Sequence, residues 1–212
     1  MKNVEAKEGL RIAGKVKIEA FRAGMVELVA PYLEQIRIYQ SLLHTEAPSA
    51  YRDHLHERIE RMKVQVDTIK AAYFLRTAVE TRNLVMDSPG YGLDLIIQRL
   101  VGINTYSLNL DWIEIGTGTT TPTVNDTGLT TPSLRLPVSF QQDYGATDAI
   151  VQAYVTDANL PNGTYGEVGS FVDGTSDIGS GQIFNHALLS PTYTKVSGED
   201  STIQVDINIV NS

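Results

Sequence analysis

The four histidines are the first residues to test for catalysis or metal binding. His54 and His56 stand two positions apart in a segment with helical spacing, so they point to different faces and cannot share a metal ion. His44 falls in an expected turn and His186 in an expected strand. The chain has no cysteine, which excludes disulfides, thiol nucleophiles and cysteine-ligated metals. The sequence therefore predicts no metal site and no cofactor.

Two loops carry residue types that suggest ligand binding. Residues 116–122 are rich in Gly and Thr, but a phosphate loop needs a lysine and a following helix, whereas a strand is expected here. Asp173 and Asp177 could hold calcium, although Asp side chains in turns more often bond to their own backbone. Nothing singles out a pair of carboxylates for glycoside hydrolysis. We therefore expect that the protein is not an enzyme.

Charge and composition change near residue 104. Residues 1–104 carry fifteen Lys/Arg and thirteen Asp/Glu, whereas residues 105–212 carry two and twelve, so their net charges are +2 and −10. Helix formers dominate before this point and strand or turn formers after it. The total of −8 argues against nucleic acid and anionic membranes as partners. The first thirty residues have no signal-peptide pattern, and no apolar run reaches the roughly 20 residues of a membrane span.

The first half of the chain predicts a strand and a long helical hairpin. Residues 14–21 alternate between apolar and charged side chains, as in a half-buried strand, which we expect to join the later sheet as an added strand or arm. Two apolar stripes then follow at helical spacing, with a turn at residues 44–49 between them. Regular helix is expected from Pro31 in the first stripe and from about Ser49 to Glu80 in the second.

Burial of these stripes alone would not offset the conformational entropy lost in ordering the hairpin. The stripes should therefore contact the β domain, a second copy or another protein. The predicted interaction residues are Met25, Val29, Ile36, Tyr39, Leu43, Tyr51, Leu55, Ile59, Met62, Val66, Ile69 and Tyr73.

The second half predicts an antiparallel β-sandwich. A short amphipathic helix is expected at residues 91–101, followed by six or seven short strands separated by turns, as in immunoglobulin-like or jelly-roll folds. One strand is expected at residues 134–141, and the last one alternates cleanly through Ile203, Val205 and Ile207. The predicted fold is α+β: an N-terminal strand or arm (1–22), a helical hairpin with a connecting helix (23–104) and a β-sandwich domain (105–212).

Three stretches of the second half carry a resemblance to a known class of proteins. Residues 110–122 form a strand that ends in Gly-Thr-Gly-Thr-Thr-Thr-Pro, followed by Asp-Thr-Gly-Leu at residues 126–129 and then by Arg135. Residues 162–171 contain a Glu-x-Gly-x-Phe strand. Residues 181–188 precede Lys195 and the final alternating strand. This order of motifs resembles a recurrent type of tailed-bacteriophage virion protein over about residues 83–210.

The resemblance implies a structural protein of the virion, assembled in the host cytoplasm. Such proteins lie at the head surface, the neck or collar, or the tail-fibre attachment region. The implied partners are other virion proteins and copies of the chain itself, in a homo-oligomer. Relatives often carry an acidic residue shortly before the arginine, whereas Thr-Pro-Ser-Leu precedes Arg135 here.

A second interpretation is a carbohydrate-binding module of a host-recognition fibre. It depends on aromatic side chains being exposed on loops, since sugars stack on aromatic faces. Tyr144, Tyr165 and Tyr193 are the candidates, because they fall at predicted turns or strand ends.

Overall fold

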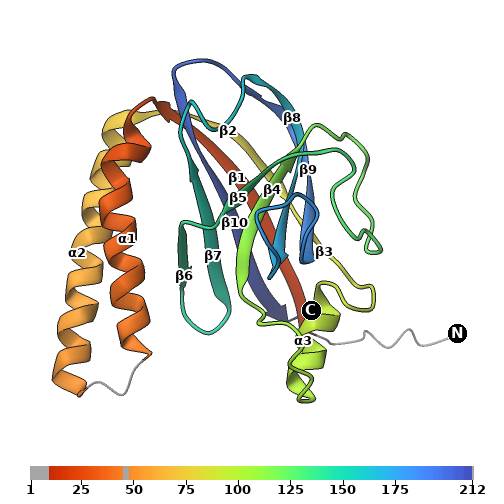
Figure 1. Cartoon of the computed structure of the whole chain (residues 1–212), viewed down its shortest axis with the longest axis horizontal. Helices are drawn as coiled ribbons and strands as arrows, with labels where there is room; N and C mark the ends of the chain where they lie inside the picture. Colours follow the sequence, from red (N-terminus) through yellow and green to blue (C-terminus); the bar gives the residue numbers. More distant parts are fainter. Residues whose placement is uncertain (1–9, 45–47, 212) are drawn as a thin grey trace, which may run out of the picture.

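The computed structural model describes residues 10–44 and 48–211. These residues form a mixed α+β fold with three helices and two antiparallel sheets of five strands each. The sheets lie face to face, the hairpin of α1 (Met25–Leu43) and α2 (Ser49–Tyr73) stands beside one of them, and α3 (Leu93–Leu100) lies at one end of the sandwich (Figure 1). The structure thus confirms the predicted sandwich in its coarse form.

Each sheet combines strands from distant parts of the chain. The first sheet runs β2–β1–β10–β7–β6, with bounds β1 (Leu10–Arg22), β2 (Phe74–Arg82), β6 (Phe140–Asp143), β7 (Asp148–Val155) and β10 (Glu199–Asn211). The second runs β3–β9–β8–β4–β5, with bounds β3 (Leu84–Val85), β4 (Leu110–Gly116), β5 (Pro132–Pro137), β8 (Gly163–Val172) and β9 (Gln182–Lys195).

Strand β1 lies inside the first sheet, between β2 and β10. It pairs with β10 over its whole length, from Leu10 opposite Asn211 to Arg22 opposite Glu199. Val16 and Ile18 point into the sandwich and are fully buried, as the alternation of residues 14–21 predicts. Strands β1, β2 and β3 all precede residue 104, so the sandwich extends beyond residues 105–212. Residues 1–9 of the predicted arm lie outside the described residues.

The second helix ends earlier than expected. It stops at Tyr73, and the chain continues directly into β2, so the predicted extension to Glu80 is wrong. The reason is tertiary: β2 pairs with β1 and buries Val79 in the sandwich core, which helical spacing alone does not reveal. The first helix begins at Met25, after Gly24 with φ of 94°, and so contains Pro31 rather than starting there.

The single strand expected at residues 134–141 is two strands. β5 ends at Pro137 and pairs with β4 in the second sheet, whereas β6 begins at Phe140 and pairs with β7 in the first. The chain therefore crosses from one sheet to the other within three residues. Helix α3 closes the sandwich end nearby, with Leu95 buried in the same core.

Candidate functional site

A contiguous apolar seam joins the two helices of the hairpin to each other and to one face of the first sheet. Six of the twelve predicted interaction residues are buried: Met25, Val29, Ile36, Leu55, Ile59 and Val66. All of these except Leu55 belong to one apolar cluster, and five more of the twelve are partly buried against it: Tyr39, Leu43, Met62, Ile69 and Tyr73. Tyr51 is exposed. The cluster also contains Phe21, Phe140 and Tyr154 from the sheet, so the stripes are largely covered within the chain.

The hairpin is anchored to the sheet near its base. The N–H of Val26, in the first turn of α1, donates to Oδ2 of Asp200 at 2.9 Å, and the N–H of Ala23 donates to the carbonyl of Gly198. Lys70 of α2 lies over the rings of Phe21 and Tyr154, with its Nζ 5.8 and 5.7 Å from the ring centroids. Burial lowers the pKa of Lys70.

Asp200 connects this anchor to a buried ion pair, that of Lys195 with Asp157. Its other oxygen accepts the N–H of Asp157 at 2.8 Å. Asp157 pairs with Lys195, whose side chain is fully buried, and it also accepts the N–H of Gly198 at 2.9 Å. The hydrogen bond from Lys195 lowers the pKa of Asp157. Lys195, a residue of the third resemblance motif, therefore fixes the turn on which the hairpin rests.

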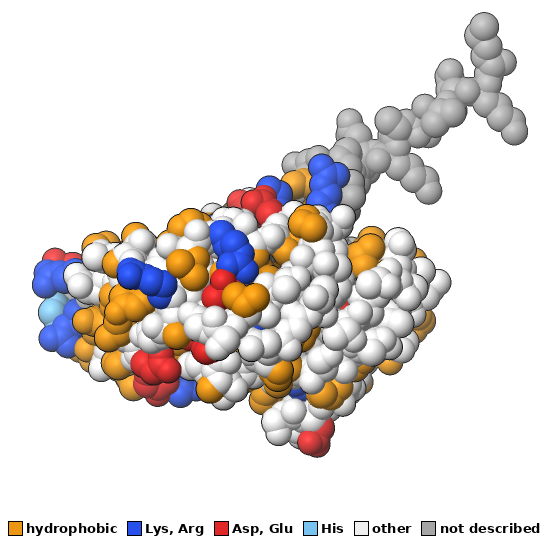
Figure 2. Space-filling model, turned by 90° about the horizontal axis from the view of Figure 1, so that it is seen from above, with side chains coloured by type: hydrophobic (Ala, Val, Ile, Leu, Met, Phe, Trp, Pro, Cys, Tyr) orange, Lys and Arg blue, Asp and Glu red, His pale blue; other side chains and the backbone are white. Residues whose placement is uncertain are grey.

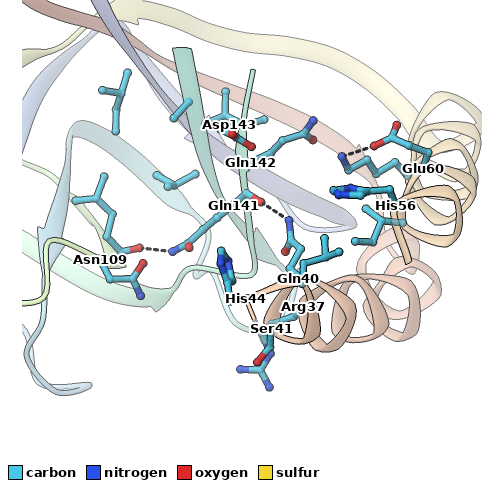
Figure 3. Close-up of a pocket in the computed structure, with 18 of the residues that line it drawn as sticks. Arg37, Gln40, Ser41, His44, His56, Glu60, Asn109, Gln141, Gln142 and Asp143 are labelled. Atoms are coloured by element: carbon cyan, nitrogen blue, oxygen red, sulfur yellow. Dashed lines mark hydrogen bonds and ion pairs between the residues drawn. The ribbon is translucent and has the colours of Figure 1, made fainter. Parts of the chain in front are cut away.

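Away from this base, a cleft separates the hairpin from the first sheet. The cleft has two lobes. The lobe at the end of the hairpin far from this base has a volume of about 940 Å³ and lies between the C-terminal half of α1, α2 and strand β6. Figure 3 shows Gln40 reaching across it: its amide donates to the carbonyl of Gln141 at 3.0 Å. The side chain of Gln141 in turn donates to the carbonyl of Leu110 at 2.9 Å. His44, just after the end of α1, and His56 of α2 both line this lobe (Figure 3).

The resemblance motifs converge on one buried carboxylate. Glu167 of β8 is fully buried and accepts three backbone N–H groups, from Gly118 at 3.1 Å, Thr130 at 2.9 Å and Thr131 at 2.6 Å. These donors come from both ends of the loop between β4 and β5 (residues 117–131), which we call the Gly-Thr-rich loop. A carboxylate held by several N–H groups is a strong anchor, so Glu167 fixes this loop to the second sheet.

His186 of β9 lies beside Glu167 and is also buried. Its Nε2 is 3.0 Å from Oε2 of Glu167, and its Nδ1 is 2.8 Å from Oδ2 of Asp126. Asp126 also accepts the hydroxyl and N–H of Thr123. Although burial raises the pKa of Asp126, the hydrogen bonds from Thr123 and His186 outweigh it and lower that pKa below its ordinary value of 3.8. The hydrogen bonds that link Thr123 through Asp126 and His186 to Glu167 therefore position the loop and leave no reactive group exposed.

Arg135 finds its acidic partner on the neighbouring strand. It stands opposite Glu114 in the pairing of β4 with β5, and their Nη1 and Oε1 atoms are 2.6 Å apart with both side chains buried. The guanidinium lies between the rings of Trp112 and Phe171, at 5.0 and 4.9 Å from their centroids. Sequence reasoning looked for the partner shortly before Arg135 and missed it, because only the strand register brings Glu114 close.

The tyrosines proposed to stack on sugars are not all exposed. Tyr165 and Tyr193 are buried and stack on each other, with ring centroids 6.3 Å apart. Their hydroxyls bond to the Pro161 carbonyl and the Ser201 hydroxyl, each at 2.7 Å. Only Tyr144 is exposed, with 55% of its surface accessible. A glycan site made of all three tyrosines is therefore wrong.

Helix α3 carries an exposed apolar patch. Its inner face buries Leu95, whereas Ile97, Leu100, Val101 and Ile103 are each half or more exposed, Leu100 by 76%. Large exposed apolar patches mark contact surfaces. We name these four residues the α3 patch.

None of the described helices is long and apolar enough to cross a membrane.

Charges are also distributed unevenly over the surface. Arg135 and Lys195, the two cations of residues 105–212, are both buried, so the Lys and Arg side chains at the surface come from residues 1–104. Most of those visible in Figure 2 lie over the hairpin half of the molecule.

No group of three or more His, Asp or Glu among the described residues is placed to hold a metal ion. Asp173 instead accepts the N–H and hydroxyl of Ser107.

Comparison of the chain with protein-family models, with curated proteins and with solved structures gave no match.

Proposed function

We propose that this protein is a non-enzymatic structural component that works by protein–protein assembly, of the kind found in tailed-bacteriophage virions. The observation that carries the proposal is the α3 patch, which offers four large apolar side chains on α3 and the residues that follow it, while the other face of the helix is fixed to the sandwich core. The location in the particle would be the head surface, the neck or collar, or the tail-fibre attachment region. The two-sheet framework suits an immunoglobulin-like or jelly-roll sandwich.

The occupant of the α3 patch would be a second copy of the chain. Charge complementarity supports this choice. Arg99, in the last turn of α3, places a positive charge beside the patch. Residues 105–212 present an acidic surface, because their two cations are buried. The basic first half of one copy would therefore attract the acidic second half of the next in a head-to-tail array. The buried network at Glu167 supports the role by fixing the Gly-Thr-rich loop to the sandwich.

Light scattering on the purified chain tests the proposal. We expect an oligomer that Leu100→Glu and Val101→Glu each convert to a monomer, and that dissociates at high ionic strength. Val196→Glu is the matched control, since Val196 is exposed in a turn between β9 and β10 and should leave the mass unchanged. A wild-type monomer at every concentration tested would contradict self-assembly. Absence of the chain from purified phage particles would contradict the virion role.

A further inference from the structure

The second lobe of the cleft has a polar floor. It lies between α2 and the outer face of β6, β7 and β10, and its volume is about 630 Å³. Small-molecule sites typically enclose roughly 300–1,000 Å³. We propose that this lobe, named here the sheet lobe, binds a neutral, hydroxyl-rich ligand of the saccharide class. The inference does not depend on the assembly role.

A chain of hydrogen bonds between side chains forms the floor. The Tyr154 hydroxyl donates to Oε1 of Gln152 at 3.2 Å, the Gln152 amide donates to Gln204, and the Gln204 amide donates to Oδ1 of Asp206 at 2.6 Å. Gln152 and Gln204 stand directly opposite each other on β7 and β10. An amide nitrogen has two N–H donors, and each glutamine uses one of them here. Gln204 is partly exposed, so its second donor suits the hydroxyls of a sugar, whereas Gln152 is buried and holds Gln204 in place.

The polarity of this floor separates it from the rest of the hairpin contact. Where the helices touch the sheet, the sheet presents Phe21, Phe140 and Tyr154 to the apolar seam. Phe140 and Tyr154 also border the sheet lobe, and beside them the same face carries Gln152, Gln204 and Asp206. A sheet face that helices cover is normally apolar. This part of the face is therefore better suited to a polar ligand than to packing against the hairpin.

An aromatic side chain stands at the lobe. Tyr144, in the turn between β6 and β7, lines it and is more than half exposed. Burial of part of its ring, together with the charges of Asp67 and Glu60, raises the pKa of its hydroxyl, so the phenol stays neutral. A tyrosine with one accessible face and a hydroxyl handle can stack on the C–H face of a sugar ring and bond to its hydroxyls.

The charges of the lobe select against acidic ligands. It contains four acids, Glu60, Asp67, Asp148 and Asp206, against Lys63 and Lys70. Lys63 is paired with Glu60 at 2.7 Å, and Lys70 lies 3.8 Å from Glu19. The remaining negative charge repels phosphates, sulfates and uronic acids. Amides and hydroxyls are then the groups left to recognise a ligand, which favours a neutral saccharide.

The test uses the full chain on an array of neutral and acidic oligosaccharides. We expect binding to neutral members, weakened at least ~10-fold by Tyr144→Ala and by Gln204→Ala, as the loss of one good contact would give. Gln65→Ala and Tyr91→Ala are matched controls outside the cleft and should bind as the wild type does. Thermal unfolding of each variant checks that it folds.

A second measurement locates the ligand on the unaltered protein. Addition of the best-binding oligosaccharide should shift the NMR signals of the Gln152 and Gln204 side-chain amides and leave that of Gln65 in place. The proposal is overturned if no oligosaccharide binds, if only acidic ones bind, if Tyr144→Ala and Gln204→Ala bind normally, or if the shifts appear at other amides. A monomeric protein that binds neutral sugars would refute the assembly role and leave this inference standing.

Discussion

Nε2 of His186 lies 3.0 Å from Oε2 of Glu167, and its other ring nitrogen lies 2.8 Å from Asp126. The imidazole of His186 therefore bridges two carboxylates through its two ring nitrogens. Since Glu167 also accepts three N–H groups of the Gly-Thr-rich loop, this contact joins the loop to strands β8 and β9.

Replacement of Glu167 by Gln should strongly destabilise the protein. The amide group of glutamine places an N–H donor where the loop supplies donors, and it leaves His186 without a charged partner on that side. A buried hydrogen-bond donor left without its acceptor costs about 1–3 kcal/mol, and Glu167 accepts from three such N–H groups. Urea unfolding followed by circular dichroism measures the free energy of unfolding.

Glu57→Gln is the control for this variant. Glu57 forms an exposed pair with Arg61 on α2, at 2.6 Å, and such surface pairs contribute little to stability because water and salt screen them. If both substitutions changed the free energy of unfolding equally, Glu167 would not be the anchor described here.

Asp126 should make the stability depend on acidic pH. Its pKa in the folded protein is below 3.8, so its ionised form contributes stability above the pKa of the unfolded state, and this contribution is lost as the pH falls through the folded pKa. Asp126→Asn should therefore be less stable than the wild type at neutral pH, by about 1–3 kcal/mol. The difference should shrink below pH 3.8. Urea unfolding at a series of pH values measures it, and a constant difference would contradict the assignment.

The local elements follow from short-range patterns in the sequence. Alternation identifies β1 and β10, since Val16, Ile18, Ile203 and Val205 all point into the core. Helical spacing identifies α1 and α2, but it runs on through Tyr73 and hides the change to strand there. What ends the helix is pairing of β2 with β1, a contact across more than fifty residues.

The candidate sites depend on such distant contacts and are harder to predict. Glu114 and Arg135 are 21 residues apart and meet only because the register of β4 and β5 places them opposite each other. The sheet lobe joins Gln152 with Gln204, which belong to strands that are neighbours in the sheet but far apart in the chain. Composition places most of the strands after residue 104, yet β2 and β3 lie in the half rich in helix formers, and composition gives no information on which strands pair.

Substitution of Arg135 by Met should leave Glu114 as a buried charge without its main partner. We expect a loss of about 3–5 kcal/mol, which includes the contacts with Trp112 and Phe171. Arg135→Met combined with Glu114→Leu removes both charges, so the double variant should be less destabilised than the sum of the two single variants. A double-mutant cycle from urea unfolding provides the measurement. Strict additivity would show that the two side chains do not interact.

Gly118 should tolerate no side chain, because its α-carbon faces the buried Glu167. A β-carbon built at Gly118 would lie 2.4 Å from Oε1 and 2.6 Å from the carboxyl carbon of Glu167. The carboxylate cannot move aside without losing its bonds to Thr130 and Thr131. Gly118→Ala should therefore lower the free energy of unfolding by about 1–3 kcal/mol, as expected for an overpacked site.

Gly128 lies in the same loop and provides the matched control. A β-carbon there would have no neighbour within 4 Å, so Gly128→Ala should be nearly neutral, within roughly 0.5 kcal/mol. Thermal and urea unfolding of both variants measure the difference, and the pair separates crowding at Glu167 from a general loss of loop flexibility. Equal effects of the two substitutions would contradict the close approach of the loop to Glu167, and with it the anchoring role of that carboxylate.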